Sequence, residues 1–97
     1  MKKQSEKKLG EVIRAWLNER RRLRNEVLQR RIQRLWAELM GESITRYTDS
    51  VLFVRGKLYI SISSAVLRQE LSMGREKIKN LLNEALQEPL IDEVICR

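Results

Sequence analysis

Seven arginines within a stretch of fifteen residues are the chemically most distinctive feature of this 97-residue sequence. They are Arg20, Arg21, Arg22, Arg24, Arg30, Arg31 and Arg34. A guanidinium stays charged at physiological pH, and its planar set of donors binds phosphate oxygens in pairs. On a helix, Arg20, Arg24 and Arg31 share one face, while Arg30 and Arg34 lie one turn apart on another. The series predicts contacts to a phosphate backbone, which set affinity and register but carry no base sequence.

The charge of the chain is concentrated in its first third. The formal net charge is +7, from 20 basic and 13 acidic residues. Residues 1–34 carry twelve basic and four acidic side chains, a net +8, whereas residues 35–97 carry a net −1. A one-sided cationic field attracts DNA, RNA or an acidic membrane surface. The alternative is a solvated helix surface that keeps the protein soluble, but the clustering favours a polyanion.

Other chemistry is excluded mainly by missing residue types. The chain has no histidine, which excludes histidine triads, histidine bases and histidine metal sites, and its single Cys96 excludes disulfide frameworks and cysteine zinc sites. Its four isolated glycines form no phosphate-binding loop, and its carboxylate pairs, such as Glu70 with Glu76, are typical of surface charge. We therefore predict a non-enzymatic protein without a cofactor or metal. No apolar run approaches the roughly 20 residues of a membrane span, and the lone thiol without a signal peptide predicts a cytoplasmic protein.

The arginines lie between two apolar stripes with helical spacing. Residues 1–8 are predicted to be a disordered basic tail, and residues 9–97 a single domain. The first stripe is Leu9, Val12, Ile13, Trp16 and Leu17, and the second is Leu28, Ile32, Leu35, Trp36 and Leu39. Residues 18–25 between them are nearly all polar, which favours two helices with a short break, although one long helix is also open. Both tryptophans are predicted to pack in the core.

Residues 51–63 change to the alternating pattern of a β-hairpin, with a two-residue turn that contains Gly56. One face of the hairpin is wholly apolar and requires a covering of helices; it consists of Val51, Phe53, Leu58, Ile60 and Ile62. The other face is mixed and includes Lys57 and Tyr59, so it is either solvated or a contact surface. The Tyr59 ring could stack on a base or take part in ordinary sheet packing.

The last third predicts a helix followed by a strand. Ser64 is a good N-cap, and a helical stripe continues from residue 67 to residue 85, with Gly74 on the stripe where it would permit close packing. Pro89 ends this helix, and residues 91–96 are β-branched enough to form a third strand. The resulting order, α(α)ββαβ, predicts an α+β domain whose three-stranded sheet is covered on one face by helices.

Several short motifs, in this order, resemble the DciA-like family of bacterial proteins, formerly a domain of unknown function. They are Leu9-Gly10-Glu11-Val12-Ile13, Trp36-Ala37-Glu38-Leu39-Met40-Gly41, Gly56-Lys57-Leu58-Tyr59-Ile60, Arg68-Gln69-Glu70-Leu71 and Asn83-Glu84-Ala85-Leu86. The resemblance spans roughly residues 9–97. It implies a KH-like fold, DNA binding and a role in loading or operating the DnaB-type replicative helicase. An RNA-binding role has also been suggested for the family.

The chain departs from the family pattern at a few places. Leu67 stands where many members carry tryptophan, and Tyr47 where many carry histidine. There is no Gly-x-x-Gly loop, so the usual KH clamp on a single strand is not expected. Many members also have a C-terminal extension implicated in contacting the helicase, whereas this sequence ends at Arg97.

Together these observations predict a nucleic-acid-binding accessory protein of bacterial DNA replication. Its expected partners are DNA, single- or double-stranded and with little sequence preference, or RNA, together with the replicative helicase. The predicted contact residues are the seven arginines together with Lys57 and Tyr59. The alternatives are an RNA-binding module, or a protein-interaction or self-association module that uses residues 9–40.

Overall fold

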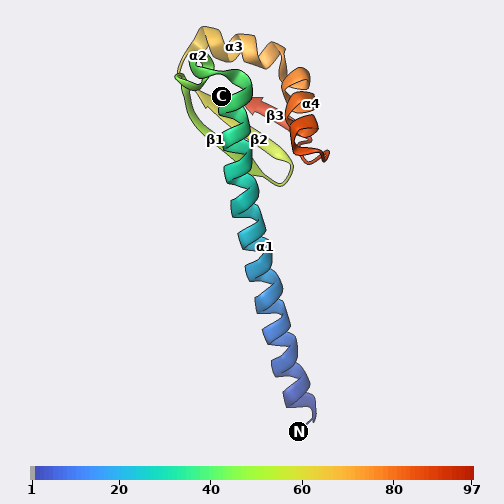
Figure 1. The fold of residues 1–97 in the computed structure, drawn as a ribbon. Coiled ribbons are helices and arrows are strands. Elements are labelled where there is room, and N and C mark those ends of the chain that lie inside the picture. The colour runs from blue at the N-terminus through green and yellow to red at the C-terminus, as the bar shows by residue number, and fades with distance from the viewer. Residues whose placement is uncertain (1) are drawn as a thin grey trace.

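The computed structural model describes residues 2–97 of the chain, with the surroundings of side chains given from residue 5 onward. It is an α+β domain with one very long helix and one small sheet (Figure 1). The elements are α1 (Lys2–Met40), α2 (Glu42–Thr45), β1 (Thr48–Val54), β2 (Lys57–Ile62), α3 (Ala65–Met73), α4 (Arg75–Leu86) and β3 (Glu93–Cys96). The predicted α+β class is confirmed.

Helix α1 runs without interruption for 39 residues, so the expected break between two shorter helices is wrong. The polar stretch at residues 18–25 contains neither proline nor glycine, and it continues as a solvated helix. The first half of α1 projects far beyond the rest of the molecule (Figure 1). As a result, the whole molecule is 65 Å long. The radius of gyration is therefore 18.3 Å, against about 12.5 Å for a compact chain of this length. Residues 2–8 belong to this helix, and the predicted division of the chain at residue 9 stays a prediction.

The sheet has the strand order β1-β2-β3, in which β1 and β2 are antiparallel and β2 and β3 are parallel. Val54 pairs with Lys57, so the hairpin turn is Arg55-Gly56. Both turn residues have positive φ, 49° and 83°, as a type I′ turn requires. The turn begins one residue before the Gly56-Lys57 pair suggested by the sequence. This shift leaves the alternation of the strands unchanged, so the predicted division of residues between the two faces is confirmed.

The hydrophobic core lies on one face of the sheet, beneath α1, α3 and α4. Its buried members are Ile32, Trp36, Val51, Leu58, Ile60, Ile62, Leu71, Ile78, Leu82, Leu86, Ile91 and Val94. Trp36 is 1% exposed, which confirms its predicted place in the core. Trp16 is 58% exposed, so the same prediction is wrong for that residue. Only the second half of α1 packs on the sheet, because the first half extends past its end (Figure 1).

Polar side chains attach α1 to the outer edge of strand β1. The Gln29 carboxamide accepts a 2.8 Å hydrogen bond from the backbone N–H of Phe53 and donates to the carbonyl of Val51. The indole N–H of Trp36 donates to the Thr48 hydroxyl at 3.1 Å. The Gln29 bonds satisfy backbone groups of an edge strand, and together with the Trp36 bond to the Thr48 side chain they fix how α1 crosses the sheet.

The predicted C-terminal helix is divided into two at Gly74, which ends α3 and begins α4. A Cβ at this position would meet only the carbonyl oxygen of Leu71, at 3.8 Å, so the expectation that Gly74 permits close packing is wrong. Helix α4 ends at Leu86, before Pro89, as predicted. The Asn83 carboxamide then makes two 2.9 Å hydrogen bonds to the backbone of Ile91, which direct the chain into β3.

Replacing Gly56 with alanine should destabilise the domain by about 1–2 kcal/mol, because its φ of 83° is left-handed and disfavours any residue with a Cβ. The new Cβ would also collide with the carboxylate of Asp92. Asp92 is held in this place because its backbone N–H donates a 2.7 Å hydrogen bond to the carbonyl of Gly56. Urea unfolding followed by circular dichroism measures the change. Gly10→Ala is the control, since that helical position has open space around it and should not lose stability. Equal stability of Gly56→Ala and the parent chain would contradict this account.

Candidate nucleic-acid interface

Six of the seven predicted arginines form what we call the arginine surface of α1. They are Arg20, Arg21, Arg24, Arg30, Arg31 and Arg34, and every one of them is exposed. Among the residues whose side chains the structure describes, none of the six forms an ion pair with a carboxylate. At about 1.5 Å of rise per residue, Arg20 and Arg34, the first and last of the six, lie about 21 Å apart along the helix axis. Duplex DNA presents about 12 phosphate charges over that length, so phosphates would be available to all six.

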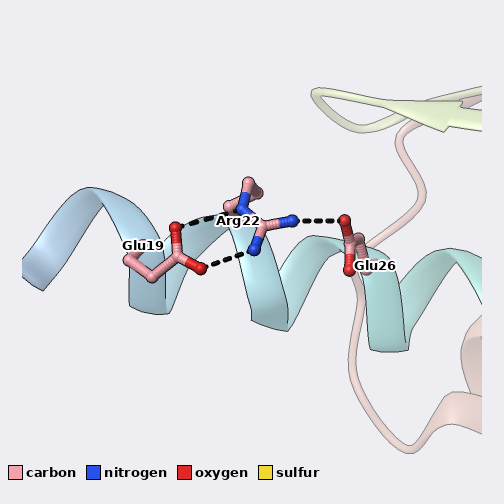
Figure 2. Close-up of polar contacts among 3 residues, drawn as sticks. All are labelled: Glu19, Arg22 and Glu26. Carbon is pink, nitrogen blue, oxygen red and sulfur yellow. Dashed lines mark hydrogen bonds and ion pairs between the residues drawn. The ribbon is translucent and has the colours of Figure 1, made fainter.

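The seventh arginine, Arg22, is neutralised within the helix and does not belong to this surface. Figure 2 shows its guanidinium between two carboxylates: it donates to both oxygens of Glu19, with Nε at 3.1 Å, and to Glu26 at 2.6 Å. The hydrogen bonds and charge of Arg22 lower the pKa of Glu19, and the same contacts with Glu19 raise the pKa of Arg22. Glu19 and Arg22 are therefore both charged at neutral pH. The i,i+3 and i,i+4 spacing of these residues is the sequence signal that indicates this arrangement.

Two arginines of the surface make weaker contacts that leave them accessible. The Arg20 guanidinium lies over the exposed ring of Trp16, 5.4 Å from its centroid, in a cation–π arrangement. Arg31 is 3.5 Å from the carbonyl oxygen of Ala85 in α4. Arg20, Arg21, Arg24 and Leu17 surround a shallow depression on the projecting part of the helix. The arginine surface thus begins on the free half of α1 and continues onto the half that covers the sheet.

Lys57 and Tyr59 are not close to these arginines. Both lie on the face of β2 that no helix covers, whereas α1 packs on the opposite face. The Tyr59 ring is half-buried, and the Arg97 guanidinium lies 4.6 Å from its centroid. A base that stacked on that side of the ring would have to displace Arg97. The structure therefore separates the predicted contact residues into a helical group and a sheet group.

The apolar stripe on the projecting half of α1 is exposed, whereas the leading sequence interpretation placed its Trp16 in the core. It comprises Leu9, Val12, Ile13, Trp16, Leu17, Leu23 and Val27, all of them exposed. At about 100° per residue, Trp16 and Trp36 point roughly 160° apart on one continuous helix. The two apolar stripes therefore cannot face the same core. This difference in phase was present in the sequence, but the assumption of two separate helices concealed it.

The described part of the chain contains no constellation typical of catalysis. No three of its histidine, cysteine, aspartate and glutamate side chains lie close enough to hold a metal ion. Burial raises the pKa of the Cys96 thiol, which disfavours the nucleophilic thiolate at neutral pH. A hollow of about 350 Å³ between α1 and the segment after α4 is lined by apolar side chains, Arg24, Arg31 and Glu88. None of the described helices is long and apolar enough to span a membrane.

Comparison with protein families connects this geometry to a biological process. The model of the family described as Dna[CI] antecedent, DciA, matches residues 8–96, nearly the whole chain. No curated protein sequence and no solved structure matches this chain. DciA is not a known enzyme family; it is associated with the replicative helicase DnaB, and its role in bacterial replication is helicase loading. By this match, the chain belongs to the DciA family.

Proposed function

We propose that this protein binds the phosphate backbone of nucleic acid through the arginine surface of α1 while it serves the replicative helicase. The observation that carries this proposal is the set of six exposed guanidiniums without carboxylate partners among the described side chains. Contacts of this kind give affinity that depends strongly on salt and little on base sequence. Such binding suits an accessory factor that must act wherever the helicase is loaded, in the bacterial cytoplasm.

Single- or double-stranded DNA is the ligand we favour, because the family acts in DNA replication. An RNA ligand would meet the same phosphate chemistry, so direct competition between DNA and RNA of equal length distinguishes the two. The uncovered face of the sheet, which carries Lys57 and Tyr59, is the proposed second contact region. The parallel third strand and helices on one side are the features that lead us to propose a KH-like fold, here without the Gly-x-x-Gly clamp.

A salt titration tests the proposed binding. Six phosphate contacts predict that log K falls with log salt with a slope of about −5 on duplex DNA, and that affinity falls by about a thousandfold between 50 and 200 mM salt. Fluorescence anisotropy of a labelled duplex of mixed sequence measures the slope, and a second duplex of different sequence is the control. A slope near zero, or binding to only one of the two duplexes, would contradict the proposal.

The association with the helicase is tested separately, by pull-down with purified DnaB-type helicase in the presence and absence of single-stranded DNA. We expect capture in both conditions, with more protein retained when DNA is present. Retention that disappears after nuclease treatment would mean that DNA alone joins the two proteins.

A further inference from the structure

The projecting half of α1 extends past the sheet (Figure 1), and among its described apolar residues only Leu23 and Val27, at its end, lie beside another part of the chain, the segment with Glu88 and Leu90. In proteins, most of the stability of a helix comes from packing its apolar face against other parts of the structure, and here that face is exposed. Its exposed apolar stripe repeats with alternating steps of four and three residues, which is the spacing of a coiled-coil seam. The seam consists of Leu9, Ile13, Trp16, Arg20, Leu23 and Val27. Its five apolar members are between 47% and 60% exposed, so all of them are available to a partner.

The residue types along the seam specify the number of strands. In heptad notation, Leu9, Trp16 and Leu23 are at d positions, and Ile13, Arg20 and Val27 are at a positions. Among parallel coiled coils, leucine at d with β-branched residues at a favours two strands. A single charged residue at an a position, here Arg20, lowers stability but fixes the register. The seam therefore has the pattern expected of a parallel dimer.

The residues beside the seam are complementary in charge to a second copy of this chain. In a parallel dimer, a residue at g contacts the residue five positions later, at e, on the partner helix. This rule pairs Glu19 of one helix with Arg24 of the other, and Glu26 with Arg31. It also pairs the apolar Val12 with Leu17. An antiparallel pair would instead bring the arginines of one flank together and the glutamates of the other flank together.

The globular part of the domain packs mainly on the side of α1 away from the seam, and it approaches the seam only at its end, where Leu23 and Val27 border the hollow beside Leu90. Ile32, which is buried on the sheet, occupies an f position, the position farthest from a coiled-coil seam. Glu11, Asn18 and Asn25 occupy the same position on the projecting half, where all three are exposed. In Figure 1, the sheet and the helices α3 and α4 surround only the second half of α1. Two copies can therefore pair along the seam with their sheets on the outside.

We propose that two copies of this chain associate through a parallel two-stranded coiled coil formed by residues 9–27 of α1. Apolar pairing ends at Val27, because the next two seam positions are Arg30 and Arg34, which would face their own copies, and the flanking pair of Glu26 with Arg31 closes this end of the coiled coil. Arg22 already bonds to both Glu19 and Glu26 on the same helix (Figure 2). Each carboxylate has acceptor sites enough to receive a second guanidinium from the partner helix.

Exchanging the flanking charges tests the pairing. We expect the unmodified chain to dimerise reversibly in sedimentation equilibrium, and two variants, Arg24→Glu with Arg31→Glu and Glu19→Arg with Glu26→Arg, each to dimerise at least tenfold more weakly. Each variant alone places like charges against one another. An equimolar mixture of the two restores opposite charges at every pair, so it should recover association. A monomeric parent chain, or a mixture no tighter than the separate variants, would overturn the proposal.

Cysteine cross-linking tests the parallel direction. In a Cys96→Ser background, Leu23→Cys places equivalent d positions together, so a disulfide should form between two copies on mild oxidation. Asn18→Cys, on the outer f position of the same helix, is the matched control and should remain reduced. A dimer that cross-links through position 18 as readily as through position 23 would overturn the proposed seam.

The proposal does not depend on nucleic-acid binding, and its tests are made without nucleic acid. Arg24 and Arg31 belong both to the arginine surface and to the flank of the seam. Failure to dimerise would leave the salt-dependent binding of DNA intact, whereas failure to bind DNA would leave the charge exchange unaffected.

Discussion

Replacing Trp36 with alanine is expected to lower the free energy of unfolding by about 3–5 kcal/mol, the range for removal of a large buried aromatic side chain. Trp36 is 1% exposed and lies in the core with Ile32 of the same helix. Its indole N–H also donates to Thr48, so the substitution removes a hydrogen bond as well as creating a cavity. Small domains are marginally stable, and a loss of this size is a large fraction of the total.

Urea unfolding followed by far-ultraviolet circular dichroism measures this loss. Trp16→Ala is the matched control: the same substitution on the same helix removes a side chain that packs against nothing in the core. It should change the unfolding free energy by less than about 0.5 kcal/mol, at protein concentrations low enough to keep the copies apart. Trp36→Phe should lie between the two, because it keeps most of the apolar volume and loses the bond to Thr48. Similar losses for the two alanine variants would contradict the assignment of one buried and one exposed tryptophan.

Replacing Arg20, Arg21 and Arg24 together with glutamine is expected to weaken DNA binding by about 100-fold, taking about 1 kcal/mol for each solvent-exposed contact. The slope of log K against log salt should also fall from about −5 to about −3, because each phosphate contact contributes about 0.9. These side chains lie on the projecting part of α1, away from the core. The domain should therefore unfold at an unchanged urea concentration. Because Arg20 and Arg24 also belong to the proposed seam and its flank, binding is measured at protein concentrations low enough to keep the copies apart, so that any loss reports on contacts to the ligand.

A charge-matched control separates local contacts from net charge. Arg46, Arg75 and Lys77 are exposed cations that do not belong to α1. Replacing these three with glutamine removes the same total charge and should leave the slope near −5. Equal slopes for the two triple variants would show that net charge, rather than the arginine surface, governs binding. Fluorescence anisotropy on one labelled duplex measures both variants under identical conditions.

The long helix connects the two proposals physically. Its second half is fixed to the sheet by Gln29 and Trp36, which bond to Phe53 and Thr48 in strand β1. Its first half carries both the exposed apolar seam and the first arginines of the surface beyond the body of the domain (Figure 1). A second copy would stabilise this half by burying the seam, and the arginines outside the paired flank would then be held on a more rigid support.

Local patterns in the sequence determined much of this protein. The alternation of residues 51–63 predicted the two faces of the hairpin correctly, because side chains of a strand alternate whatever surrounds it. Helical spacing predicted that α1, α3 and α4 are helices, and the clustered charge predicted where the cations lie along the chain. The motif order indicated the DciA family, which the family match confirms.

Tertiary structure decided which of these local features face one another. Trp16 and Trp36 both lie on helical stripes, and only the unbroken course of α1 through residues 18–25 places one in solvent and the other in the core. Strand β3 pairs beside β2 and leaves Tyr59 on the face opposite α1, so the predicted contact residues separate into two groups. Periodicity gives the direction of each side chain relative to its own element. The direction relative to the rest of the molecule depends on where helices continue and how they pack, and those contacts join residues far apart in the sequence.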